Sequence, residues 1–86
     1  MKMDKDKTIS ELVEERDHYR NVAKKQSEAA EEHEQKGDVY ALRPRGGEAA
    51  RTERAFAMVC RENAAAFAQR ADRKQKKIDD REGVTT

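Results

Sequence analysis

Apolar residues recur at intervals of eleven positions along the second half of this 86-residue chain. Two such sets run along neighbouring edges of one pattern: Phe56, Phe67 and Ile78 in the first, and Ala49, Cys60 and Ala71 in the second. Eleven residues complete three turns at about 3.67 residues per turn, so each set stays on one face of a straight helix. The repeat therefore predicts a long helix with one apolar stripe that packs against other helices.

A first helix is predicted over residues 8–36 from its start and stop signals. Thr8 and Glu11 form the pattern of a capping box, in which a hydroxyl and a carboxylate satisfy free backbone amides at a helix start. No proline or glycine follows until Gly37, and a glycine just after a cation, here Lys36, is a common helix end. The residues expected to begin the seam of this helix are Ile9, Leu12 and Tyr19.

The turn-rich stretch at residues 37–47 separates the first helix from a second one over residues 48–81. It contains the single proline, Pro44, which does not fit inside a helix because it lacks a backbone N–H. Two long helices joined by a loop of about ten residues most simply form an antiparallel hairpin. The predicted fold is therefore all-α, a coiled-coil-like antiparallel two-helix hairpin.

The hairpin is expected to span residues 8–82. Residues 1–7 and 83–86 carry no helical period and are predicted to be flexible. In an antiparallel pair with this loop, the numbers of facing residues sum to about 86. Tyr19 then lies opposite Phe67, and acidic residues of the first helix lie beside basic residues of the second.

The composition limits what a single hairpin can bury. Charged residues make up 43% of the chain and hydrophobic residues only 35%, many of them alanine. Bulky apolar residues are too few for a thick core around one chain. A flat face of small residues, Ala57, Ala64, Ala68 and Ala71, lies off the stripe and would let a second chain approach closely. These features predict a homodimer that forms a four-helix bundle.

Asn63 is a polar residue within the apolar stripe of the second helix. In one interpretation its amide pairs across the seam and fixes the register of the helices. In the other it points to solvent at the edge of the stripe. The full set of residues expected at the dimer or hairpin seam is Ile9, Leu12, Tyr19, Phe56, Cys60, Asn63, Phe67, Ala71 and Ile78.

No group of residues has the pattern of a catalytic or cofactor site. His18 and His33 are 15 positions apart on one helix, too far for one metal ion. Cys60 has no base placed beside it by the sequence, so we interpret it as a small packed residue. As the only cysteine, it has no partner for an intrachain disulfide. We therefore expect no enzyme activity, no cofactor and no metal.

The loop between the helices is the candidate binding site. It offers apolar Tyr40 and Leu42 beside basic Arg43 and Arg45, a mixture typical of protein hot spots. The other interpretation is that its apolar side chains only cap the hairpin. We expect a small non-enzymatic protein-binding module, such as a regulator or inhibitor of a larger protein. Phage and mobile-element accessory proteins, including anti-CRISPR inhibitors of host defence, are often built this way, and this likeness is one of architecture alone.

The alternative function is nucleic-acid binding. The basic cluster Arg70, Arg73, Lys74 and Lys77 could contact phosphates or an acidic surface, together with the Arg43–Arg45 loop. A formal net charge of +1 disfavours this alternative, and the same basic residues can pair with glutamates of the first helix. No apolar run reaches the length of a membrane span or a signal-peptide core, so we expect a cytoplasmic protein without membrane contact.

Overall fold

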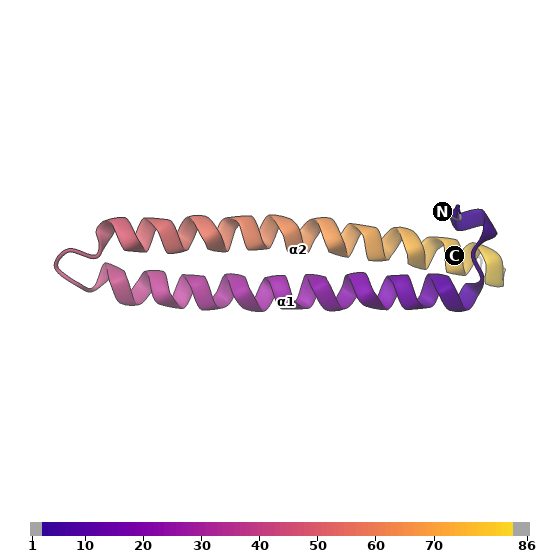
Figure 1. The fold of residues 1–86 in the computed structure, drawn as a ribbon, viewed down its shortest axis with the longest axis horizontal. Coiled ribbons are helices and arrows are strands. Elements are labelled where there is room, and N and C mark those ends of the chain that lie inside the picture. Colours follow the sequence, from indigo (N-terminus) through magenta and orange to yellow (C-terminus); the bar gives the residue numbers. More distant parts are fainter. Residues whose placement is uncertain (1–2, 84–86) are drawn as a thin grey trace.

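Two long antiparallel helices joined by a short loop make up the described part of the protein, residues 3–83 (Figure 1). In the computed structural model, helix α1 spans Ile9–Ala41 and helix α2 spans Gly47–Glu82. A turn of 3-10 helix, η1 (Asp4–Asp6), precedes them. The expected all-α hairpin is confirmed, and the molecule is 59 Å long.

The outer ends of both helices follow local signals. Thr8 Oγ1 accepts a hydrogen bond from the backbone amide of Glu11 at 3.1 Å, which confirms the predicted cap of α1. Gly83 ends α2 in a left-handed conformation with a φ of 73°, which glycine adopts without strain. Residues 1–2 and 84–86, parts of the two segments predicted to be flexible, lie outside the described residues.

The inner end of α1 differs from the prediction, because the helix continues through Gly37 to Ala41. Gly37 is buried against α2, where a Cβ atom would lie 3.3 Å from Arg54 Cγ and 3.4 Å from the carbonyl oxygen of Ala50. Glycine here permits a close approach of the two backbones and does not end the helix. The loop is accordingly short, Leu42–Gly46, in place of the longer stretch predicted.

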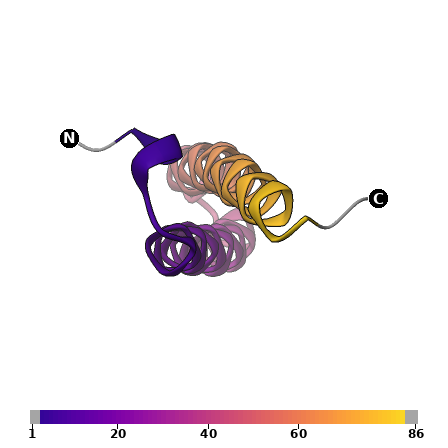
Figure 2. The same ribbon diagram turned by 90° about the vertical axis from the view of Figure 1, so that its right-hand side faces the viewer.

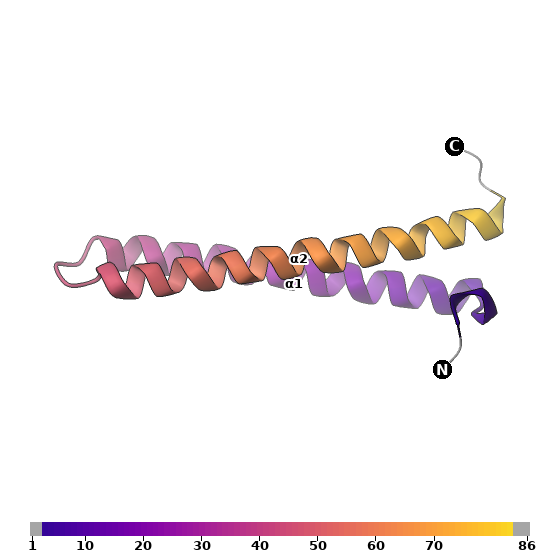
Figure 3. The ribbon, with the colours of Figure 1, turned by 90° about the horizontal axis from the view of Figure 1, so that it is seen from above.

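The residues protected from solvent between the helices follow a seven-residue repeat, and we call this set the seam. In α1 the seam residues are Leu12, Arg16, Tyr19, Ala23, Gln26, Ala30, His33, Gly37 and Tyr40. In α2 they are Ala50, Glu53, Ala57, Cys60, Ala64, Phe67, Ala71, Lys74 and Ile78. A seven-residue repeat stays in contact only when two helices wind around each other in a left-handed sense. Figure 3 shows the helices crossing at a shallow angle.

This repeat replaces the eleven-residue stripe predicted from the sequence. On helices wound at 3.5 residues per turn, each eleven-residue step moves a side chain about 50° around the axis. The set Phe56, Phe67 and Ile78 therefore passes from outside the seam to its centre. Phe56 is 50% exposed, Phe67 is half-buried and Ile78 is buried.

Small residues fill every second layer of the seam in the half that adjoins the loop. The facing pairs in these narrow layers are Ala23 with Ala64, Ala30 with Ala57, and Gly37 with Ala50. The layers between them hold larger side chains. Tyr19 faces Phe67, as expected, with ring centroids 6.1 Å apart. Farther along, His33 faces Glu53.

The alanine face assigned to a second chain is a correction to the sequence analysis. Ala57 and Ala71 are each only 1% exposed, because α1 of the same chain covers them. Ala64 is half-buried in the same seam, and Ala68 is exposed. The small residues thus serve contact within the hairpin.

Three residues predicted at the seam lie outside it. Asn63 is exposed, so within the hairpin the interpretation that it points to solvent is the correct one. Phe56 lies beside His33, with ring centroids 5.4 Å apart, and keeps half of its surface exposed. Ile9, in the first turn of α1, is 37% exposed. The other predicted seam residues are buried or half-buried: Leu12, Tyr19, Cys60, Phe67, Ala71 and Ile78.

Enlarging a narrow layer should destabilise the hairpin. We expect Ala57→Leu to lower the free energy of unfolding by about 1–3 kcal/mol, because a close-packed layer has no room for three more carbon atoms. Ala55→Leu is the matched control, the same change at an exposed position of α2, and should stay within about 0.5 kcal/mol. Urea denaturation followed by circular dichroism measures both. Equal effects of the two substitutions would contradict the narrow seam.

Candidate protein-binding site at the hairpin loop

The loop that joins the helices is held by its own backbone. The amides of Leu42, Arg43 and Gly46 donate hydrogen bonds of 3.2, 3.0 and 3.1 Å to the carbonyl oxygens of Val39, Tyr40 and Arg43, respectively. A Cβ atom on Gly46 would lie 1.8 Å from the carbonyl oxygen of Tyr40, so a larger residue does not fit there unless the backbone moves. The loop is therefore a compact, ordered turn.

The apolar side chains of the loop end are largely uncovered. Leu42 is 88% exposed and Val39 is 52% exposed, while Tyr40 is half-buried. The expectation that these residues only cap the helix ends is therefore wrong for Leu42. Together the last turn of α1 and the start of the loop present three neighbouring apolar side chains that another molecule can bury.

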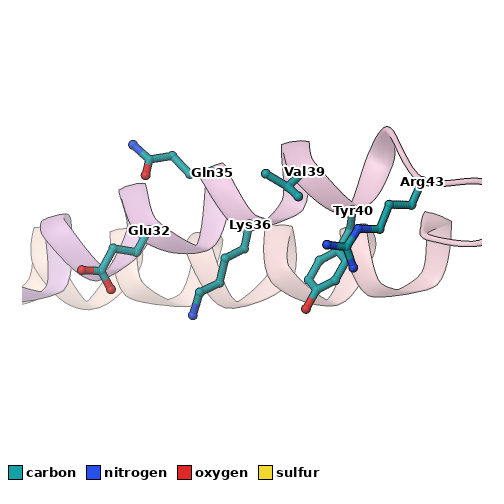
Figure 4. Close-up of a pocket in the computed structure, with 6 residues that line it drawn as sticks. All are labelled: Glu32, Gln35, Lys36, Val39, Tyr40 and Arg43. Atoms are coloured by element: carbon teal, nitrogen blue, oxygen red, sulfur yellow. The ribbon is translucent and has the colours of Figure 1, made fainter.

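Arg43 lies over the ring of Tyr40, with its guanidinium carbon 5.3 Å from the ring centroid. This cation–π contact favours one position of a long, otherwise mobile side chain. A cavity of about 340 Å³ opens beside the pair, along the face of α1 that carries Lys36 and Val39 (Figure 4). A second cavity of about 490 Å³ shares Tyr40 and Arg43 and reaches Arg45. We call the two cavities together the loop-end groove.

The basic end of α2 is paired within the chain, at the opposite end of the molecule. Lys74 Nζ lies 2.7 Å from Asp4 Oδ1 and 2.6 Å from Glu15 Oε2. Lys7 Nζ bridges the same two carboxylates at 3.1 and 2.6 Å, and Lys77 also pairs with Asp4. These five residues form the terminal ion cluster, whose ion pairs hold η1 against α2. Figure 2 shows η1 beside α2.

The terminal ion cluster favours the charged forms of Asp4, Lys7, Glu15 and Lys74. Hydrogen bonds from Lys74 and Lys77 hold the pKa of Asp4 well below its ordinary value, and hydrogen bonds from Lys7 and Lys74 lower the pKa of Glu15. Burial lowers the pKa of Lys74, but its hydrogen bonds to the two carboxylates outweigh burial and raise this pKa overall. The same two carboxylates raise the pKa of Lys7.

The other two residues of the predicted basic cluster do not join these lysines. Arg70 covers the aromatic pair of the seam, with its guanidinium carbon 5.0 Å from the ring centroid of Phe67 and 6.0 Å from that of Tyr19. Arg73 is exposed. The residues predicted at the loop thus lie near one another. The predicted phosphate contacts do not act as one group, because Lys74 and Lys77 pair with carboxylates while Arg70 lies over aromatic rings.

The histidines and the cysteine make contacts within the hairpin. His33 Nδ1 lies 2.5 Å from Glu53 Oε2 across the seam, and His18 lies beside Tyr19 with ring centroids 5.7 Å apart. Cys60 is half-buried in the seam. Among the described residues, no three histidine, cysteine or carboxylate side chains are arranged to hold a metal ion.

Neither of the two long helices in the described part of the chain is apolar enough over a sufficient length to cross a membrane.

The anchoring of the N-terminal segment was missed by the sequence analysis. Residues 3–7 form η1 and its flanks, in place of a frayed segment, and bring Asp4 onto α2. The only local signal for such pairs is the alternation of acidic and basic residues in this segment. The partner Lys74 lies 70 positions away, so no local pattern could identify it.

Comparison with known proteins adds no relative from which a role could be transferred. No family model matches the chain, no curated protein matches it, and no solved structure matches it. The functional proposal therefore rests on the geometry and chemistry of the chain itself.

Loss of the Asp4 carboxylate should release η1 and destabilise the hairpin. We expect Asp4→Asn to lower the free energy of unfolding by about 1 kcal/mol at pH 7, because Lys74 and Lys77 lose a charged partner. Asp6→Asn, in the same turn, is the control, since the Asp6 side chain is exposed. Urea denaturation measures both variants.

The effect of Asp4→Asn should also depend on pH. A carboxyl group whose pKa is lowered in the folded state contributes stability above its ordinary pKa of about 4, and this stability is lost as the pH falls through the folded value. The difference in the free energy of unfolding between Asp4→Asn and the unchanged protein should therefore become smaller below about pH 4. A difference that stays constant down to acid pH would show that Asp4 acts by packing and not by charge.

Proposed function

We propose that this chain is a small non-enzymatic protein-binding module that docks on a larger protein through its loop end. The residues that would carry the contact are Tyr40, Leu42, Arg43 and Arg45. The observation that supports the proposal most directly is the exposure of Leu42, at 88%, on a turn that is ordered by backbone hydrogen bonds. An exposed leucine on this turn adds almost no buried apolar area to the hairpin itself, so a contact with another molecule would account for it.

The physical chemistry of the loop end suits a protein partner. Tyrosine and arginine are the residues most enriched at binding hot spots, because they combine apolar area with hydrogen-bonding groups. An ordered loop also loses less conformational entropy on binding than a mobile one. A module of this kind acts as a regulator or inhibitor when it occupies a surface that the larger protein needs.

Nucleic-acid binding, the alternative, is supported less well. A shared phosphate site would need the Arg43–Arg45 loop and the basic end of α2 on one face. These two regions lie at opposite ends of the hairpin (Figure 1). Lys74 and Lys77 are already paired with carboxylates, so phosphate binding would have to break those pairs.

The triple variant Tyr40→Ala, Arg43→Ala and Arg45→Ala should weaken binding to a protein partner by about 2 kcal/mol or more, because it removes the hot-spot side chains of the loop. The partner is the protein retained by the immobilised hairpin from cells of its native host. A matched control is the double variant Lys24→Ala and Lys25→Ala, which removes the same positive charge from an exposed face of α1. Titration calorimetry compares the affinities.

Circular dichroism and light scattering should show unchanged helicity and mass for the triple variant. Unchanged affinity would move the binding surface to the helix faces. Loss of helicity together with affinity would instead show that the loop is structural.

We further propose that two hairpins associate as a homodimer, which would form a four-helix bundle. Among the bulky apolar residues of the described chain, only Leu12 and Ile78 are fully buried in the seam. Phe56, Met58 and Val59 each keep half or more of their surface exposed on α2. A second copy would remove this apolar area from water.

Light scattering at micromolar concentration should give about twice the chain mass of 9.9 kDa. Replacing Phe56 and Val59 by serine should lower the mass toward that of one chain, since both side chains lie outside the seam of the hairpin. A single-chain mass for the unchanged protein, with cooperative unfolding that does not depend on concentration, would contradict self-association.

A further inference from the structure

The loop-end groove has an apolar floor with basic groups around it. Val39 and the ring of Tyr40 line the cavity along α1, and Pro44 and Ala49 line the cavity beside the loop. Figure 4 shows Lys36 and Tyr40 on this stretch of α1 and Arg43 just beyond its end. Leu42 lines neither cavity but adds exposed apolar surface next to them, at the tip of the hairpin.

The described residues that line the loop-end groove give it a net positive charge. Lys36, Arg43 and Arg45 contribute three cations, and Glu32 is the single carboxylate that lines the groove. Among residues 3–83, no carboxylate forms an ion pair with any of these three cations. The lysines of the terminal ion cluster, in contrast, each pair with Asp4, Glu15 or both.

An acidic partner would complete pairs that the chain leaves open. Arg43 is already positioned by its contact with Tyr40, so its planar guanidinium can donate hydrogen bonds to a carboxylate with little further ordering. Apolar side chains of the same partner would cover Val39 and Leu42. A strongly basic partner would instead place like charges against Lys36 and Arg45, which costs free energy.

We propose that the loop-end groove binds an acidic, apolar peptide segment of the protein partner, in which carboxylates alternate with bulky aliphatic or aromatic side chains. The carboxylates pair with Lys36, Arg43 and Arg45, and the apolar side chains pack on Val39, Tyr40 and Leu42. This inference rests on the proposed function, because it names the chemistry recognised by the same loop end.

Nucleic acid satisfies the charge of the groove but not its apolar surface. Single-stranded nucleic acids bind by stacking bases on exposed aromatic rings. Tyr40 is the only aromatic residue of the groove, and Arg43 already lies over its ring. Leu42 and Val39 would remain exposed beside a phosphate chain. The peptide is therefore the occupant that uses all of the groove.

The test is a selection from a library of random twelve-residue peptides against the purified hairpin. We expect the enriched peptides to carry net negative charge and at least two bulky apolar residues. The tightest peptide, labelled with a fluorophore, is then titrated with each variant. Lys36→Gln together with Arg43→Gln should weaken binding about tenfold or more. The control pair Lys24→Gln and Lys25→Gln, with the same charge change outside the groove, should change it less than about twofold.

A further variant separates the apolar part of the site from its charge. Leu42→Ser leaves every cation in place and should still weaken the peptide several-fold, because it removes the most exposed apolar side chain of the tip. Circular dichroism should show unchanged helicity for each variant, since these side chains lie outside the buried part of the seam.

Three results would overturn the inference. The first is enrichment of basic or uncharged peptides. The second is an equal loss of affinity in the Lys24 and Lys25 control pair. The third is binding of a thymine oligonucleotide as tightly as the best peptide, with the same loss on changing Lys36 and Arg43, which would assign the groove to nucleic acid.

The test also separates this inference from the proposed function. Suppose that a cellular partner no longer binds the triple loop variant, but contacts the loop through a basic segment. This result would support the proposed function and reject the acidic segment. Acidic peptides that bind the groove, while every cellular partner remains on the triple variant, would reject the proposed function alone.

Discussion

The close approach of two helices through alanine and glycine is the constraint on which the hairpin depends. At Gly37 the helices are so near that even a methyl group would meet Arg54 Cγ at 3.3 Å and the carbonyl oxygen of Ala50 at 3.4 Å. Small side chains remove little apolar area from water, so such a seam gains less from the hydrophobic effect than a leucine-rich one. Part of the difference is made up by dispersion contacts between closely spaced backbones. Several larger apolar side chains, Phe56, Met58 and Val59 among them, stay on the outer surface.

Polar pairs make the alignment of the two helices specific. Arg16 donates a hydrogen bond of 2.8 Å to Gln75, and His33 contacts Glu53 in a half-buried position. A shift of one helix along the other would leave these partly buried groups without partners, at a cost of about 1–3 kcal/mol for each group. Composition alone would allow many registers between two alanine-rich helices, and these pairs select one of them.

Features that depend on neighbouring residues could be predicted from the sequence. The Thr8 cap and the two uninterrupted helices belong to this class. The register of Tyr19 with Phe67 followed from loop length. The seam repeat could not be predicted, because alanines are so frequent in α2 that steps of seven and of eleven both match. The sequence does not distinguish a glycine that ends a helix from one, like Gly37, that lets a second helix pack closely against it.

For the candidate site, the sequence supplied the residue types and the structure supplied their surroundings. Tyr40, Leu42, Arg43 and Arg45 were identified as a group from their chemistry. Whether Leu42 covers the helix ends or faces solvent depends on the course of a short loop, which local propensity does not determine. The pairing of Lys74 with Asp4 depends on contacts between the two ends of the chain, and this pairing removes the lysine from the set of available cations.

The placement of the loop relative to the chain ends has a mechanical consequence. Asp4 and Glu82 lie together at one end of the hairpin, and the loop lies at the other (Figure 1). Two helices wound together resist bending far better than a disordered linker of the same length, which would coil and shorten. Anything attached beside Asp4 or Glu82 would therefore be held away from the loop by a stiff rod of nearly the full 59 Å. A hairpin of this length can therefore place its loop inside a deep cleft of another molecule while its chain ends stay outside.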